Sequence, residues 1–183
     1  MDATWQSIMA LDLKTVKDRL NKNPNMLNAA PRLRPAANAD SAVVKELVFG
    51  VLAEYGLTPD PACTDLDLDD LEGNYASRGG CFSVLETTDG TIIGSVGICA
   101  AGPDVCELRK MYLSRTHRGK GLGKRLLDHG LSEARRLGFR RVLLETASVL
   151  TEAIRLYEQY GFRPYQPDHL AARCDQAYFL DLR

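Results

Sequence analysis

A glycine-rich segment at residues 118–123, which reads Arg-Gly-Lys-Gly-Leu-Gly, has the composition of a turn that binds an anion. Glycines let the backbone turn tightly and approach a ligand closely. A helical pattern of leucines begins at Leu122, so the free N–H groups and the positive dipole end of a helix are expected at this turn. Together these features predict a site for a phosphate or pyrophosphate group.

Basic residues surround this turn, although the whole chain has a formal net charge of −1. They are Arg115, His117, Arg118, Lys120, Lys124 and Arg125. The expected ligand therefore carries several negative charges, whereas the overall charge gives no indication of nucleic acid or an anionic membrane as a partner. Taken alone, a G-x-G turn is more often a plain strand-to-helix connection. It is not a Walker loop, because no Gly-Lys-Ser/Thr closes it, and it lacks the full dinucleotide-binding G-x-G-x-x-G.

Hydrophobic periodicity and turn residues predict the elements that position this segment. Strands are expected at residues 32–34, 81–86, 91–100, 106–113, 141–146, 162–165 and 177–182. Helices are expected at 44–55 with Asp40 as N-cap and Gly56 as the closing residue, at 68–75, at 122–137 before Gly138, and from Thr151, as N-cap, to Gly161. This order predicts an α+β fold in which helices pack on a mixed sheet.

The rest of the chain adds one appendage and few chemical groups. Residues 1–30 are interpreted as an N-terminal extension, either a docking helix or an artificial addition, and residues 31–183 as one domain. The five cysteines are odd in number and widely spaced, which favours free thiols in a reducing compartment. The three histidines show no metal-ligand spacing, so no metal is expected. No apolar run is long enough to span a membrane, and no signal-peptide core is present, so a cytoplasmic protein is expected.

Three blocks of the sequence together resemble the GNAT N-acetyltransferases. Arg118-x-x-Gly121-x-Gly123 resembles the acetyl-CoA motif of that family, which reads Gln/Arg-x-x-Gly-x-Gly/Ala. Residues 107–113 resemble its fourth strand, and residues 153–162 resemble its last conserved helix with the Gly-Phe that follows. The spacing of the blocks is also typical, and the resemblance is sharp over residues 106–165 and looser back to Arg32.

The resemblance implies the GNAT fold: a mixed, mostly antiparallel sheet with splayed central strands and helices on both faces. It also implies acetyl-CoA as cosubstrate. The pantetheine would lie between the splayed strands and pair with the backbone of Met111, Tyr112 and Leu113, and an N–H near Met111 would be the oxyanion donor. The pyrophosphate would be bound by the glycine-rich turn and the start of the helix, at Arg118, Gly119, Lys120, Gly121, Leu122, Gly123 and Lys124.

In this family a neutral amine attacks the thioester directly, so a proton must leave the amine and the thiolate must be stabilised. Either a carboxylate or an ordered water chain can accept that proton. Glu107 is the candidate carboxylate, because it begins the strand that lines the cleft; alternatively it faces solvent or pairs with Arg109. Tyr157 matches the tyrosine that donates to the leaving sulfur in much of the family. Alternatively Tyr157 is a core residue, since its helical spacing also suits packing, as is expected of Tyr160.

Several other residues carry weaker expectations. Leu150 and Thr151 stand where many relatives have an asparagine that contacts pantetheine, and that contact is left open. Cys106 is expected to be a buried thiol rather than a nucleophile. Arg109 and Lys110 either meet an acceptor carboxylate or are sheet-surface charges, the latter being favoured for Lys110. The acidic run from Asp60 to Glu72 either attracts a cationic amine or, as such runs usually do, forms a solvated helix start.

Three functions are compatible with these residues. The favoured one is acetyl transfer to a primary amine of a small molecule, such as an amino acid or amine. The alternative acceptor is a protein N-terminus or lysine. A non-catalytic acyl-CoA-binding regulator is the second alternative, against which the intact glycines, Glu107 and Tyr157 argue. A homodimer is a further expectation, because dimers are common in the family.

Overall fold

The computed structural model of the chain describes residues 30–182. The expected N-terminal extension therefore lies outside the described residues except for residue 30, and the boundary at residue 31 stays a prediction. Within the described part, seven strands form one open sheet in the order β1-β2-β3-β4-β5-β7-β6. Neighbouring strands are antiparallel except for β4 and β5, which run parallel. The expectation of a mixed, mostly antiparallel sheet is thus confirmed.

The elements occur in the predicted order. The strands are β1 (Arg32–Pro35), β2 (Cys81–Glu86), β3 (Ile92–Ala100), β4 (Val105–Leu113), β5 (Arg141–Thr146), β6 (Arg163–Tyr165) and β7 (Gln176–Asp181). The α-helices are α2 (Ser41–Glu54), α3 (Leu71–Asn74), α4 (Leu122–Arg136) and α5 (Thr151–Gln159). Short 3₁₀ helices are η2 (Asn38–Asp40), η3 (Leu66–Asp69), η4 (Ala76–Arg78) and η5 (Arg115–His117).

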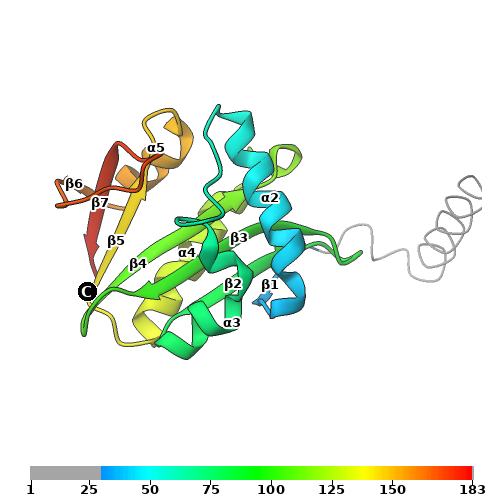
Figure 1. Cartoon of the computed structure of the whole chain (residues 1–183), viewed down its shortest axis with the longest axis horizontal. Coiled ribbons are helices and arrows are strands. Elements are labelled where there is room, and N and C mark those ends of the chain that lie inside the picture. The colour runs from blue at the N-terminus through cyan, green and yellow to red at the C-terminus, as the bar shows by residue number, and fades with distance from the viewer. Residues whose placement is uncertain (1–29, 183) are drawn as a thin grey trace, which may run out of the picture.

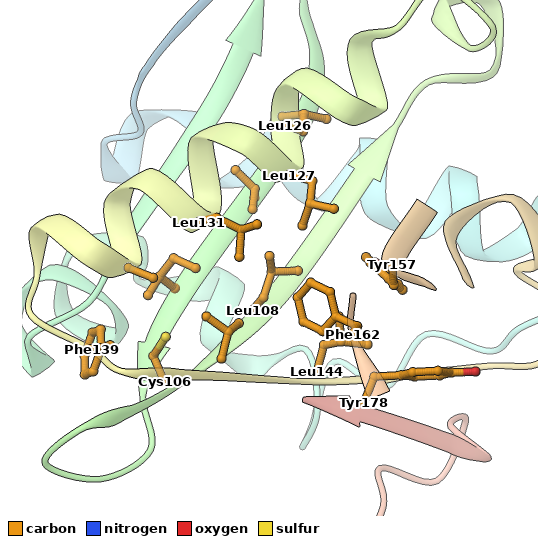
Figure 2. Packing of buried hydrophobic residues seen from close by; sticks show 14 of the residues in the cluster. Cys106, Leu108, Leu126, Leu127, Leu131, Phe139, Leu144, Tyr157, Phe162 and Tyr178 are labelled. Atoms are coloured by element: carbon orange, nitrogen blue, oxygen red, sulfur yellow. The ribbon is translucent and has the colours of Figure 1, made fainter. Parts of the chain in front are cut away.

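Helices cover both faces of the sheet, as Figure 1 shows, with α2 and α3 on one face and α4 on the other. The apolar face predicted for α4 is buried there: Leu126, Leu127 and Leu131 point toward the strands and meet Leu108 of β4 (Figure 2). A second apolar cluster joins α2 and α3 to β2 and β3. No helix within residues 30–182 combines the length and the apolar character that crossing a bilayer requires.

The central strands β4 and β5 are paired over a short stretch only and then diverge. They pair only between residues 105–107 of β4 and residues 141–143 of β5, although β4 continues to Leu113 and β5 to Thr146. Figure 1 shows the two strands converging near the C-terminus and diverging from there. The splayed central strands expected from the family resemblance are therefore present, and they open a gap in the middle of the sheet.

The two helix caps expected from the sequence have different outcomes. Asp40 is the N-cap residue of α2, as expected, but its carboxylate does not bond the helix amides: it accepts hydrogen bonds from Arg34 at 2.7 and 2.9 Å and from the Ala37 N–H. A charge-assisted, bidentate arginine is a stronger partner than a helix amide. Thr151 is the first residue of α5 rather than its N-cap, a position that Leu150 takes, and its hydroxyl bonds Glu152.

Candidate active site

A cavity of about 700 Å³ lies where β4 and β5 diverge. Its walls come from α2, the end of β4, the glycine-rich turn, the end of β5 and the first turns of α5. Seven of the predicted site residues line it: Met111, Tyr112, Leu113, Arg118, Gly119, Gly123 and Tyr157. The other predicted residues, which are Glu107, Lys120, Gly121, Leu122 and Lys124, are not among the lining residues.

The glycine-rich turn delivers backbone donors to one end of this cavity. Gly119 and Gly121 have φ angles of 73° and 75°, a region that residues with a Cβ rarely adopt. Helix α4 begins directly afterwards, and its first backbone hydrogen bond runs from the Arg125 N–H to the Gly121 carbonyl at 3.1 Å. The N–H groups of residues 122–124 precede that bond and so have no acceptor within the helix. This arrangement suits a pyrophosphate.

Arg118 adds a fixed cation to the turn. Its Nε donates to the Leu113 carbonyl at 3.0 Å, its Nη1 donates to Glu54 at 2.8 Å, and its guanidinium lies over the Tyr55 ring. The remaining Nη2 is buried and has no hydrogen-bond partner among residues 30–182. A buried donor left without a partner is costly, so an anionic ligand in this cavity would fit the residues present.

The two lysines of the turn are engaged elsewhere. Lys120 Nζ donates to the Thr116 carbonyl at 3.0 Å. Lys124 Nζ donates to Asp128 at 3.0 Å and lies over the ring of Tyr160; hydrogen bonding with Tyr160 and Asp128 raises the pKa of Lys124. The backbone amide of Lys124, rather than its side chain, therefore lies at the start of the helix where an anion would bind. Arg115 supplies a further cation at the cavity wall.

Replacing Gly121 with alanine tests the backbone of this turn. The new Cβ meets nothing within 4 Å, so the change acts only through the positive φ, at a cost of about 1–2 kcal/mol. We expect coenzyme A to bind about tenfold more weakly in isothermal titration calorimetry, because the N–H groups that follow must reorient. Gly50→Ala is the matched control: it lies inside α2, should stabilise the fold by about 0.5–1 kcal/mol, and should leave binding unchanged. Unchanged binding in Gly121→Ala would contradict a role for this turn.

Tyr157 both packs in the core and reaches the cavity. It is 5% exposed, its ring centroid lies 5.6 Å from that of Phe162, and Figure 2 shows both in the cluster beneath α4. Tyr157 is also one of the residues that line the cavity. Burial, together with the neighbouring phenol of Tyr112, raises the pKa of Tyr157 above its usual value. The phenol therefore keeps its proton at neutral pH and can act as a donor.

Glu107 lies beside the cavity rather than in its wall. Its carboxylate is 3.4 Å from Arg109 Nε, and 29% of the side chain is exposed, so the pairing with Arg109 considered from the sequence is present. Burial raises the pKa of Glu107; Arg109 works against that shift, and the carboxylate of Glu145 adds to it. A raised pKa makes a carboxylate a better proton acceptor.

Glu145 is a carboxylate that the sequence analysis missed. It lines the cavity at the end of β5 and accepts a hydrogen bond from the Ala171 N–H at 2.9 Å. Glu107 pairs in register with Leu143, and alternate residues of a strand share a face, so Glu145 lies on the same face as Glu107. The alternation in β5 was visible in the sequence, but its pairing with β4 was needed to bring the two carboxylates together.

Lys110 was expected at the sheet surface, and that expectation is wrong. Only 3% of its side chain is exposed, and its Nζ donates to Asp65 Oδ1 at 2.5 Å and to the Thr64 carbonyl at 2.7 Å. Asp65 is fully buried and also accepts two hydrogen bonds from Arg173, at 2.7 and 2.8 Å. The acidic run is therefore only partly a solvated segment, because its central aspartate neutralises two buried cations.

The pKa of Asp65 reflects its interactions with Lys110 and Arg173. Burial acts to raise it, but hydrogen bonds from Arg173 and Lys110 outweigh burial and bring the pKa to about 2. Cys106 is fully buried, as expected, and burial raises the pKa of its thiol to about 12. Cys106 is therefore a poor nucleophile at neutral pH.

Among residues 30–182 no group of three or more His, Cys, Asp or Glu side chains is arranged to hold a metal ion.

Sequence comparisons relate the chain to acetyltransferases. The model of the acetyltransferase (GNAT) family matches residues 50–162. An uncharacterized N-acetyltransferase of Escherichia coli, YjgM, is 39% identical over 143 residues, which cover 75% of this chain and 85% of that protein. Human N-acetyltransferase 8 is 33% identical over 107 residues, which cover 55% of this chain and 46% of the human protein.

Solved structures share the fold. A GNAT-family acetyltransferase from Staphylococcus aureus has a TM-score of 0.78 at 21% identity, with 84% of this chain and 100% of that chain covered. The yncA protein of Salmonella typhimurium, solved with its cofactor acetyl-CoA, has a TM-score of 0.64 at 25% identity, with 85% and 95% covered.

Proposed function

Because this chain belongs to the GNAT family and is an acetyl-CoA-dependent N-acetyltransferase, we propose that its acceptor is the primary amine of a small molecule. The observation that carries this proposal is the contact between two loops on the α2 side of the sheet. Arg173, from the loop between β6 and β7, makes a bidentate bond to Asp65, from the loop after α2. The Ala171 N–H of the same loop is bonded to Glu145 at the cavity wall. Loops fastened in this way favour a closed acceptor pocket over an open groove for a peptide.

The proposed cofactor site follows the cavity from the turn to Tyr157. The N–H groups of residues 119–124 and the unpaired Nη2 of Arg118 would receive the pyrophosphate. The backbone of residues 111–113, on the side of β4 that β5 leaves free, would pair with the pantetheine. Both ends of this path are lined by residues that the family resemblance implied.

The proposed chemistry divides among three groups of this chain. Bound acetyl-CoA supplies an activated acetyl thioester. Glu107 accepts the proton of the acceptor ammonium, which has a pKa near 10 and must be neutral to attack. The Met111 N–H donates toward the oxygen on which negative charge develops, and a fixed dipole of this kind is commonly the largest catalytic contribution. Tyr157, which keeps its proton, donates to the leaving sulfur.

Charges near the cavity favour a cationic acceptor. The cations on this face are engaged: Lys110 and Arg173 bind Asp65, and Arg109 lies 3.4 Å from both Asp67 and Glu107. The carboxylate of Glu145 is bonded only to a neutral backbone amide among the described residues, so its charge is not cancelled. An ammonium group would therefore be attracted to this end of the cavity.

A thiol-release assay with acetyl-CoA tests the proposal. The acceptors are amino acids, polyamines, aminoglycosides and short peptides, and we expect turnover with a small amine. Turnover with peptides alone would favour the protein acetyltransferase, and cofactor binding without any turnover would favour the regulator. The homodimer and the cytoplasmic location remain predictions, which analytical ultracentrifugation and cell fractionation address.

Glu107→Gln is expected to lower kcat/KM about tenfold at neutral pH, a modest loss because ordered water can also accept the proton. Glu107 works only when ionised and its pKa is raised, so wild-type activity should fall as the pH drops through that raised pKa. The glutamine variant should lack this acidic limb in a pH–rate profile. The rise in rate that accompanies deprotonation of the acceptor ammonium should remain in both proteins. If Glu145→Gln removes the limb instead, the base is Glu145.

A further inference from the structure

Strand β4 contains a bulge at Lys110. Pairing with β3 joins Ser95 to Tyr112 and Gly97 to Arg109, which leaves Lys110 and Met111 together opposite Val96. Lys110 has a φ of 51°, the only positive φ of a non-glycine residue within residues 30–182. Met111 has no register partner on β3, and β5 pairs with β4 only as far as Glu107. The Met111 N–H thus lies outside both strand ladders.

The peptide between Lys110 and Met111 is held by a serine of the neighbouring strand. Ser95, which is fully buried on β3, donates its hydroxyl hydrogen to the Lys110 carbonyl at 2.7 Å. Because the peptide is trans, its N–H points opposite to its carbonyl. A carbonyl directed at β3 therefore directs the Met111 N–H away from β3, toward the gap that the cavity occupies.

The side chain of Lys110 provides a second anchor for the same residue. Lys110 Nζ bonds Asp65 and the Thr64 carbonyl, both in the loop after α2. The lysine is therefore fixed at its ammonium by that loop and at its carbonyl by β3. Of these two anchors, the Ser95 bond is the one that sets the rotation of the peptide plane.

We propose that Ser95 is a positioning residue for acetyl transfer: by holding the Lys110 carbonyl, it aims the Met111 N–H at the acetyl group in the cavity. Ser95 does not line the cavity, so it acts through the peptide rather than on the substrate. The inference rests on the proposed function, because it assigns Met111 the oxyanion-donor role.

Ser95→Ala removes the hydroxyl and keeps the Cβ. We expect kcat to fall about tenfold, less than complete loss of an oxyanion donor costs, while KM for acetyl-CoA and the Kd of coenzyme A stay within about twofold. Ser83→Ala is the matched control, since Ser83 is a buried β2 serine whose hydroxyl is 2.9 Å from His129 Nε2, away from the bulge. This control should keep the wild-type kcat. Equal kcat values in the two variants, or a parallel loss of cofactor affinity in Ser95→Ala, would overturn the proposal.

A second readout needs no turnover. The chain has four methionines, so selective ¹⁵N-methionine labelling gives a sparse amide spectrum, in which a Met111→Leu sample identifies the Met111 signal. In the ligand-free protein this signal should shift in Ser95→Ala and stay in place in Ser83→Ala. An unmoved signal in Ser95→Ala would show that Ser95 does not orient the Lys110–Met111 peptide, even if the wild type proved inactive. Absence of acetyl transfer in the wild type, with the signal shifted as expected, would instead count against the proposed function alone.

Discussion

Replacing Tyr157 with phenylalanine is expected to lower kcat about a hundredfold while leaving the Kd of coenzyme A unchanged. The substitution removes one hydroxyl and keeps the ring, so the packing against Phe162 survives. Burial and the charge of Tyr112, and no hydrogen bond within residues 30–182, set the pKa of Tyr157, so we expect removal of the hydroxyl to leave no described group unsatisfied. Loss of a positioned proton donor typically costs two orders of magnitude or more in rate. The thiol-release assay with acetyl-CoA gives kcat, and isothermal titration calorimetry with coenzyme A gives the Kd.

The raised pKa of Tyr157 explains why this residue suits the role. Burial and the nearby Tyr112 disfavour the phenolate, so the side chain remains a donor across the working pH range. Tyr160→Phe, at the residue that caps the C-terminus of α5, is the matched control. Its hydroxyl bonds Asp128 at 2.5 Å, neither residue lines the cavity, and loss of this hydroxyl should change kcat little. A Tyr157→Phe enzyme that loses rate and affinity equally, or neither, would show that Tyr157 serves packing alone.

Local features of the fold could be predicted from the sequence because they depend on neighbouring residues. The turn before α4 follows from glycines that adopt a positive φ, and the buried face of α4 follows from the spacing of its leucines. The gap between β4 and β5 was implied by the family resemblance, but hydrophobic periodicity did not predict it. Strand pairing depends on contacts that hydrophobic patterns do not specify, and neither do they specify the position of β7 between β5 and β6.

The charges of the site were harder to predict for the same reason. The Lys110–Asp65 contact joins residues 45 positions apart, and the Arg173–Asp65 contact joins residues 108 apart. The bulge in β4 also interrupts the alternation of side chains between the two faces of the sheet. It turns Arg109 and Lys110 toward the same face, where Arg109 meets Asp67 and Lys110 meets Asp65. A run of aspartates that resembles a solvated segment thus contains the counter-ion of two buried cations.

Asp65→Ala is expected to lower the free energy of unfolding by about 3–5 kcal/mol, because it leaves Arg173 without its partner carboxylate and leaves the buried Lys110 only Asp67, at 3.3 Å, as a counter-charge. Such a loss is a large part of the total stability of a domain, and urea unfolding at neutral pH would measure it. Asp69→Ala is the matched control from the same acidic run. Its carboxylate is half exposed and pairs with Lys45, so its removal should cost less than about 1 kcal/mol. Similar losses in the two variants would contradict the account of Asp65.

Acid should affect the stability of wild type and of Asp65→Ala differently. The pKa of Asp65 is about 2 in the folded chain, below the value of about 3.9 for an unperturbed aspartate. A depressed pKa stabilises the fold fully above the unfolded value, and this stabilisation is lost as the pH falls through the folded value. Between about pH 5 and pH 1, wild type should therefore lose about 2–3 kcal/mol more of its unfolding free energy than Asp65→Ala does. Parallel stability curves over that range would show that the carboxylate is not held ionised by Lys110 and Arg173, and the buried cluster would then need another source of its stability.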